Sequence, residues 1–219
     1  MIQLQKAKEK YKEIRLKKTL MALEKKGFDA FYFKTREEAT SKIMDMIPVE
    51  AVVGFGGSVT LRELGIPEIL RERGNKTEDH WVERQKGSSP EKVLEVRRNQ
   101  INSDFFLTST NALTEKGELV NIDGTGQRIA AMIFGPKNVI VVAGVNKIVK
   151  DLDEAMWRAR NVASPMNALR LNRNTPCMVT GVCSDCESPE RICGATTIIH
   201  RRMNDTPLTV ILVDEELGY

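Results

Sequence analysis

Four cysteines, the only ones in this chain of 219 residues, lie close together near the C-terminus in the spacing C-x5-C-x2-C-x6-C. Thiolates are soft ligands for zinc, copper(I) and iron–sulfur clusters, and a set of four satisfies either a tetrahedral zinc ion or a 4Fe–4S cluster. The spacing therefore predicts a metal centre whose ligands are Cys177, Cys183, Cys186 and Cys193.

The identity of the metal stays open at this point. Cys183 and Cys186 form one C-x2-C pair, whereas tetracysteine zinc sites usually contain two such pairs and bacterial ferredoxin motifs have shorter gaps. Gly181 and Gly194 would let backbone amides approach sulfur, which suits either metal. We favour an iron–sulfur cluster; the alternatives are a zinc ion that only stabilises the loop, and free or disulfide-paired thiols.

A glycine-rich turn is the second candidate for chemistry. Gly56, Gly57 and Ser58 follow a strand-like run and precede a helix-like one. Such a turn presents free backbone N–H groups that suit a phosphate or carboxylate. The turn matches neither nucleotide-binding glycine motif, so the alternative is a tight connection in which Ser58 caps the helix.

A polar segment in the middle of the chain holds further candidates. Asp123, Gly124 and Arg128 surround the predicted start of a helix, and Arg128 could bind a carboxylate through two hydrogen bonds. Glu115 precedes another glycine turn and could act as a general base or as a nucleophile on an activated carbonyl. The alternative for Glu115 is an ordinary surface turn residue.

The two histidines, His80 and His200, stand in polar surroundings with no recognisable nucleophile beside them. We therefore expect both to be surface residues.

The elements that must position these residues alternate between strand-like and helix-like patterns. Strands are predicted at 29–34, 51–55, 104–108, 138–143 and 208–213, and helices at 3–26, 35–47, 91–102, from about 126, and at 147–171 with a kink near Pro165. This alternation predicts an α/β fold with a mainly parallel sheet flanked by helices. We expect a single domain over residues 1–219, with an N-terminal helix at about 1–27 and a cysteine-rich insertion at about 175–195 before the last strand.

Composition limits the partners. The net charge of +3 is too small to indicate nucleic acid, and the basic N-terminal run alternates with acidic and apolar residues as on the solvated face of a helix. No apolar run approaches the length of a membrane span, so we expect a cytoplasmic protein. A reducing compartment favours metal binding by the cysteines over disulfides.

Three segments together resemble the LUD domain, the lactate-utilisation family: Gly54-Phe-Gly-Gly-Ser-Val-Thr-Leu-Arg-Glu-Leu-Gly-Ile66, the segment 103–128, and Gly135-Pro-Lys-Asn-Val-Ile-Val-Val-Ala-Gly144. The resemblance covers most of the chain. It implies a fold similar to that of the sugar-phosphate isomerase and CoA-transferase group, and a ligand surface that includes Gly56, Gly57, Ser58, Glu115, Asp123, Gly124 and Arg128.

The family is associated with the oxidation of lactate to pyruvate, and some members carry iron–sulfur ligands. The resemblance therefore implies an iron–sulfur subunit or accessory protein in the oxidation of lactate or a related organic acid. Its partners would be a small organic anion, other lactate-utilisation subunits or an electron carrier, and a second copy of the chain. This chain lacks the paired ferredoxin motifs of larger members. The alternatives are a metabolite-binding regulatory module with a structural zinc site, and a CoA-transferase-like enzyme that uses Glu115.

Overall fold

Six strands pair in parallel to form the central sheet of the computed structural model, which describes residues 2–219. Their order across the sheet is β1-β10-β7-β4-β2-β3. The strands are β1 Asp29–Phe33, β2 Val53–Phe55, β3 Thr77–Glu78, β4 Phe105–Thr108, β7 Asn138–Gly144 and β10 Leu208–Val213. The predicted mainly parallel α/β sheet is thus confirmed.

The middle of the sheet is apolar on both faces because helices cover both. β7 and β10 lie side by side with Val141 opposite Val210. Alternate residues of β7 enter different cores: Ile140 faces helices α2, α3 and α4, and Val141 faces α1 and α7. Continuous β-branched runs of this kind are typical of strands buried on both sides.

The helices are α1 Ile2–Lys25, α2 Arg36–Met46, α3 Val59–Glu63, α4 Ile66–Glu72, α5 His80–Gln85, α6 Pro90–Ile101, α7 Gln127–Ile133, α8 Leu152–Arg158, α9 Ser164–Arg170 and α10 Pro176–Thr180. A capping box begins α2: the Thr35 side chain accepts a hydrogen bond from the amide of Glu38, and the Glu38 carboxylate accepts one from the Thr35 amide. Ser58 caps α3, which was the alternative to a ligand-binding role for the glycine turn.

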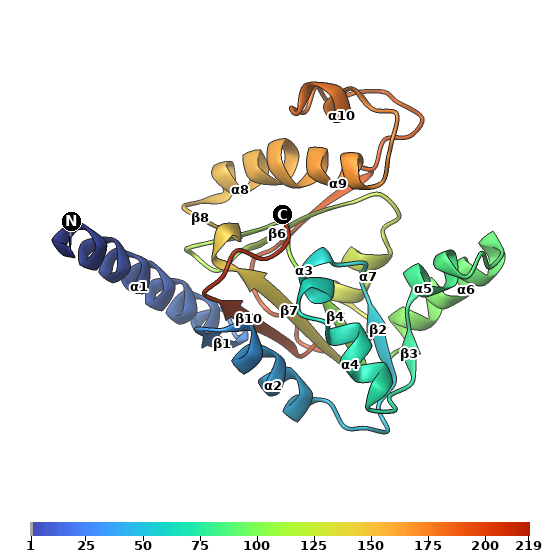
Figure 1. Cartoon of the computed structure of the whole chain (residues 1–219), viewed down its shortest axis with the longest axis horizontal. Helices are drawn as coiled ribbons and strands as arrows, with labels where there is room; N and C mark the ends of the chain where they lie inside the picture. The colour runs from blue at the N-terminus through green and yellow to red at the C-terminus, as the bar shows by residue number, and fades with distance from the viewer. Residues whose placement is uncertain (1) are drawn as a thin grey trace.

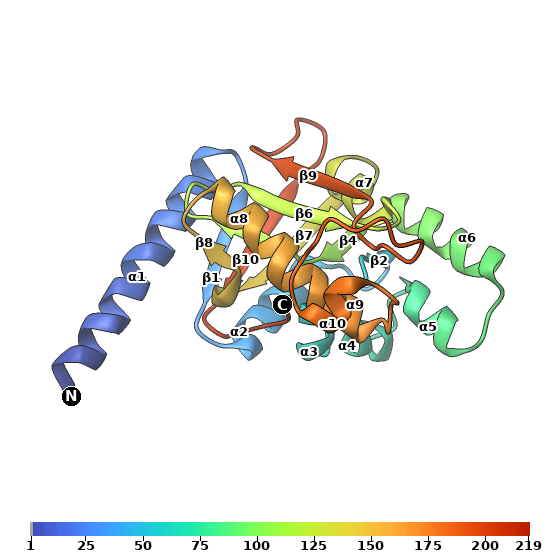
Figure 2. The same ribbon diagram turned by 90° about the horizontal axis from the view of Figure 1, so that it is seen from above.

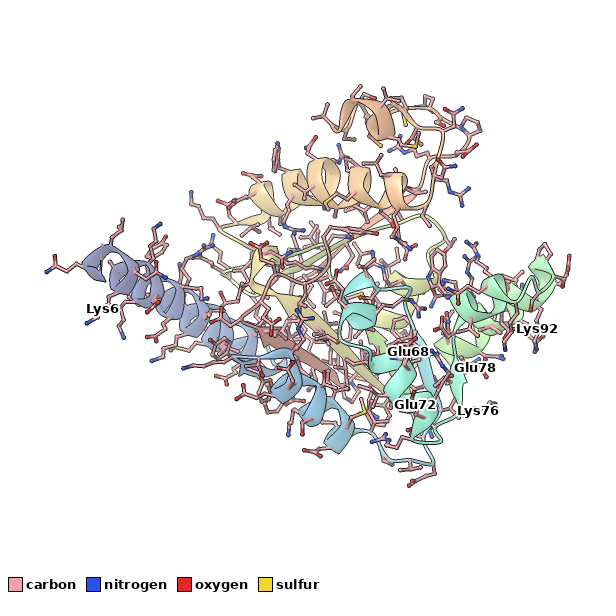
Figure 3. All side chains as sticks on the ribbon, in the orientation of Figure 1. Lys6, Glu68, Glu72, Lys76, Glu78 and Lys92 are labelled. Carbon is pink, nitrogen blue, oxygen red and sulfur yellow. The ribbon has the colours of Figure 1, made fainter. Side chains whose placement is uncertain are left out.

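The outer part of α1 projects away from the rest of the protein (Figures 1 and 2). Residues 3–14 are all exposed, and Lys6 lies on this projecting part (Figure 3). The basic N-terminal run is therefore solvated, as predicted. Within residues 2–219, no helix combines the length and the apolar character needed to cross a membrane.

A second, four-stranded sheet was not predicted. Its order is β8-β5-β6-β9, with bounds β5 Ala112–Thr114, β6 Leu119–Asp123, β8 Ile148–Val149 and β9 Ala195–Ile199. One face packs on the central sheet through Leu113 and Leu119, and the other packs on α8 through Val120. The short β8 takes the start of the helix expected at residue 147, so that helix begins at Leu152 instead.

Helices α8 and α9 lie across this second sheet and are joined by the π-helical stretch Ala159–Ala163 (Figure 1). The π-helical stretch ends just before Pro165, so the disruption predicted near Pro165 is a local change of helix type within one continuous helical run. After α9, the cysteine segment with α10 forms the layer farthest from the central sheet, and β9 returns the chain to the second sheet (Figures 1 and 2).

Candidate functional site

A cavity of about 200 Å³ opens where the parallel strands of the central sheet end. Residues that follow the carboxyl ends of β2, β3, β4 and β7 line it, together with residues that follow β6 and side chains from α6, α9 and the loop after α9. Ligands of parallel α/β sheets bind at this edge because consecutive loops converge there.

The predicted glycine turn lies in this cavity: Gly56, Gly57 and Ser58 all line it. Gly57 has a φ of +72°, and a Cβ at this position would come within 2.6 Å of the Trp81 indole nitrogen. Only glycine combines this backbone angle with so close an approach. The turn therefore brings the backbone directly beside the indole N–H.

His80 contradicts the expectation of a surface residue, whereas His200 is exposed as expected. The Gln100 amide nitrogen donates to the Glu78 carbonyl oxygen at 2.9 Å, which identifies it as the donor, and it lies 3.1 Å from His80 Nδ1. His80 Nδ1 therefore accepts, and Nε2 carries the proton. Burial, aided by the charge of Arg97, lowers the pKa of His80 to about 4, so the ring is neutral.

Lys147 is a second functional candidate that sequence reasoning missed. It is 3% exposed, and its Nζ donates to Thr60 Oγ1 at 2.9 Å and to Ser109 Oγ at 2.8 Å. Burial, with the charges of Arg158 and Arg128, lowers the pKa of Lys147 to about 7. A lysine with such a pKa can exchange a proton at neutral pH.

Four arginines, Arg84, Arg97, Arg170 and Arg173, also line the cavity. Among the residues that the structure describes, none of the four forms an ion pair. The guanidinium groups of Arg84 and Arg170 lie 5.3 and 4.8 Å from the centre of the Trp81 ring. Burial lowers the pKa of Arg97, and the charge of Arg84 lowers it further. The cavity is therefore strongly cationic and suits an anion.

Arg128 also lines the cavity, but its guanidinium is largely committed within the protein. It donates to the side-chain oxygens of Asn121 and Asn111 at 2.6 and 3.2 Å, to the Ile122 carbonyl at 2.6 Å and to the Ser109 carbonyl at 3.2 Å. Asp123 lies 3.6 Å from its Nε. Arg128 therefore holds the ends of β4 and β6 together, and Asp123 and Gly124 line the cavity beside it.

Glu115 lies elsewhere. Its carboxylate pairs with Arg15 at 2.5 Å and with Lys18 at 3.0 Å, both on α1, and it does not line the cavity. The structure thus separates Glu115 from the other predicted ligand residues and gives it a role in fastening the N-terminal helix.

The four cysteines are all half-buried and line one small pocket between α9 and the loop after α10. The Asp185 amide donates to Cys183 Sγ at 3.4 Å inside the C-x2-C turn, and Thr175 Oγ1 lies 3.3 Å from Cys177 Sγ. Burial raises the pKa of the Cys193 thiol, and the nearby Cys183 and Cys177 raise it further. As the side chains stand, no three His, Cys, Asp or Glu residues of the described chain form a group that could hold a metal.

The cysteine pocket and the cationic cavity share one wall. Ile192 lines both of them. The Gly194 amide donates to the Asp123 carbonyl at 2.9 Å, which attaches the cysteine segment to the turn that lines the cavity. The cysteine pocket is therefore adjacent to the cationic cavity.

Comparison with protein families decides the identity of the fold: the model of the LUD domain matches residues 16–213. The chain belongs to the LUD-domain family. A solved structure of a DUF162 family protein from Deinococcus radiodurans is 12% identical, with a TM-score of 0.47 over 92% of this chain and 98% of that one. The search of curated proteins found no match.

The LUD-domain match includes both the cavity loops and the cysteine segment. Of the predicted ligand residues, the fold brings together Gly56, Gly57, Ser58, Asp123, Gly124 and Arg128 and leaves out Glu115. The residues that were missed are His80, Trp81, Lys147 and the four unpaired arginines. A usable signal existed for Lys147, since it follows the clearest buried strand by a few residues.

Proposed function

We propose that this LUD-domain protein binds a small organic anion in the cationic cavity and works beside a cysteine-bound iron–sulfur cluster in the oxidation of lactate or a related organic acid. The observation that carries the proposal is the wall that the cavity and the cysteine pocket share at Ile192. Electron transfer requires a short path between donor and acceptor, and Ile192 borders both spaces.

The residues of the chain supply the binding and the proton chemistry. Oxidation of a 2-hydroxy acid to a 2-oxo acid removes two electrons and two protons. The arginines would hold the carboxylate, and neutral Lys147 would accept the hydroxyl proton because its pKa lies near neutrality. The Cα hydrogen would leave with its two electrons to a two-electron acceptor carried by a further subunit. When bound, an iron–sulfur cluster supplies one-electron transfer, and an electron carrier or a further lactate-utilisation subunit would take the electrons onward.

The chemical type of the ligands fits an iron–sulfur cluster: the pocket is lined by four thiols and by a single carboxylate residue, Asp185. The amide of Asp185 already bonds to Cys183 sulfur, and hydrogen bonds of this type stabilise bound thiolates. The segment is open to solvent and is held mainly by its own hydrogen bonds, including those from Arg191 to the carbonyls of Cys186 and Cys193 at 2.8 and 3.0 Å. Binding would draw the sulfur atoms together.

The test is the iron and acid-labile sulfide content of the full chain purified without oxygen. We expect iron and sulfide in equal amounts, lost in Cys186→Ser and retained in Glu115→Ala, which lies in a different part of the protein. Bound zinc without iron or sulfide would overturn the redox role and favour a structural site. Disulfide-paired cysteines in freshly purified protein would overturn both metals.

A further inference from the structure

The charge of the cavity exceeds what a monocarboxylate can balance. Asp123 has the one carboxylate side chain among the described residues that line it, and this group faces Arg128. The four arginines without ion pairs remain: Arg97 and Arg173 are half-buried, and Arg84 and Arg170 are exposed at the mouth of the site. Lactate would supply a single negative charge. The cavity of the described protein therefore has more positive charges than a simple hydroxy acid can neutralise.

Gathering these cations is unfavourable for the protein alone. Burial and the charge of Arg84 both oppose the charged form of Arg97, as its lowered pKa shows. The Nε donors of Arg97 and Arg173 are buried and have no hydrogen-bond acceptor in the described structure. Buried donors without partners cost stability, so a site that keeps them is expected to use them on a ligand.

Neutral donors converge on the same space. Gln127 is 9% exposed, and its side-chain nitrogen has no partner; the Trp81 indole nitrogen has none either. The fixed tautomer of His80 places a third donor, Nε2–H, close to Gly57. Apart from Asp123 Oδ2, which faces Arg128, the buried atoms without partners that line the cavity are donors, and they match a group that accepts hydrogen bonds. A phosphoryl group has three terminal oxygens that accept hydrogen bonds, one more than a carboxylate.

We propose that the cavity recognises a small phosphorylated organic acid, a phosphate ester that also carries a carboxylate. With about 200 Å³, the cavity is smaller than the sites of drug-sized ligands, which favours a compact ester over a nucleotide. The inference rests on the proposed function in one respect, that the cavity is the substrate site. It names the "related organic acid" as a phosphorylated 2-hydroxy acid whose ester lies on another carbon, so that the 2-hydroxyl stays free for oxidation.

The experiment is calorimetric titration of the full chain at neutral pH with three probes: 2-phosphoglycolate, glycolate and inorganic phosphate. 2-Phosphoglycolate has no free hydroxyl, so it is an unreactive analogue that reports binding alone. Glycolate lacks only the phosphoryl group, and inorganic phosphate lacks only the organic acid. We expect 2-phosphoglycolate to bind at least about tenfold more tightly than either of them. Equal affinity for 2-phosphoglycolate and glycolate, or binding of none of the probes, would overturn the proposal.

Two variants locate the binding. Arg97→Gln should weaken 2-phosphoglycolate binding at least about tenfold. Arg98→Gln, at an exposed position of the same helix, should leave it unchanged. Equal effects of the two variants would contradict the proposed site. Measuring iron and sulfide in the same preparation separates the proposals: tight binding without a cluster would refute the redox function alone, and a cluster without phosphate selectivity would refute this inference alone.

Discussion

Gly124 packs directly against Ile192, and a Cβ at Gly124 would lie 2.9 Å from the Ile192 carbonyl oxygen. This contact joins the turn that lines the anion cavity to the segment that carries the cysteines. Because the neighbouring atom is backbone, it cannot move aside as a flexible side chain would.

Substitution Gly124→Ala should therefore displace the cysteine segment from the cavity wall. We expect a loss of about 1–3 kcal/mol in the free energy of unfolding, as for other overpacked sites, and weaker metal retention. Gly194→Ala is the matched control, since its nearest contact, to the Asp123 carbonyl oxygen, would be an ordinary 3.4 Å. Urea unfolding and metal analysis of both variants test this, and equal behaviour would refute the role of the contact.

Lys147→Met should raise stability at pH 7 while it weakens anion binding. The pKa of Lys147 is lowered from its usual value to about 7, so between pH 7 and about 10.5 the unfolded chain binds more protons than the folded one. Wild-type stability therefore rises with pH across this window, by an amount on the order of a few kcal/mol. The difference in free energy of unfolding between Lys147→Met and the wild type should therefore become smaller as the pH rises through this window.

Lys150→Met provides the comparison, because Lys150 is exposed on the same stretch of chain. Its effect on stability should stay within about 0.5 kcal/mol at every pH. If Lys147→Met were less stable than the wild type at pH 7, the lysine would be a structural residue and the assignment of a proton-transfer role would fail.

Neutral His80 predicts a specific sensitivity to acid. Its pKa of about 4 lies below the usual 6.5, so stability from the neutral ring is fully present above pH 6.5 and is lost as the pH falls toward 4. At pH 5 the loss should be about 1–2 kcal/mol. His80→Gln should remove this part of the pH dependence, and His200→Gln, at an exposed position, should not. Identical acid profiles for both variants would show that His80 does not titrate as described.

Glu115→Ala tests whether this residue belongs to the site. Its partners Arg15 and Lys18 are partly exposed, so the loss of the ion pairs should cost no more than about 1 kcal/mol. Anion affinity should not change, because Glu115 lies outside the cavity. A loss of anion binding without a comparable loss of stability would restore the catalytic role that its position in the sequence suggested.

Much of the central sheet could be read from the sequence because burial on both faces leaves a strong pattern. The apolar run in β7 and the capping box at Thr35 are local signals that need no knowledge of distant residues. β3, with two residues, and β8, also with two, are too short to produce a pattern. Shortness therefore explains why β3 of the central sheet and β8 of the second sheet were missed. β6 and β9 have five residues each and were missed because they lie inside the polar segment and directly after the cysteine segment.

The part of the site that is formed by a glycine turn could be predicted from the sequence. The part formed by side chains that are distant along the chain could not. Gly57, directly after a strand-like run, indicates a sharp turn, and its φ is positive in the structure. His80, by contrast, is buried and neutral because Gln100 of α6 and the charge of Arg97 surround it, and nothing near residue 80 reveals either. Glu115 was a site candidate because its carboxylate stands beside a glycine turn. In the structure, this carboxylate pairs with Arg15 of α1 and lies away from the cavity.

The most direct test of the account is the electron paramagnetic resonance spectrum of the chemically reduced full chain, purified without oxygen, with and without a saturating anion. A cluster held beside the cavity should give an iron–sulfur signal that shifts when the anion binds, and Arg97→Gln should abolish the shift while it keeps the signal. Absence of an iron–sulfur signal, or a signal that a bound anion leaves unchanged, would contradict the proposal that the cysteines and the cavity form one functional site.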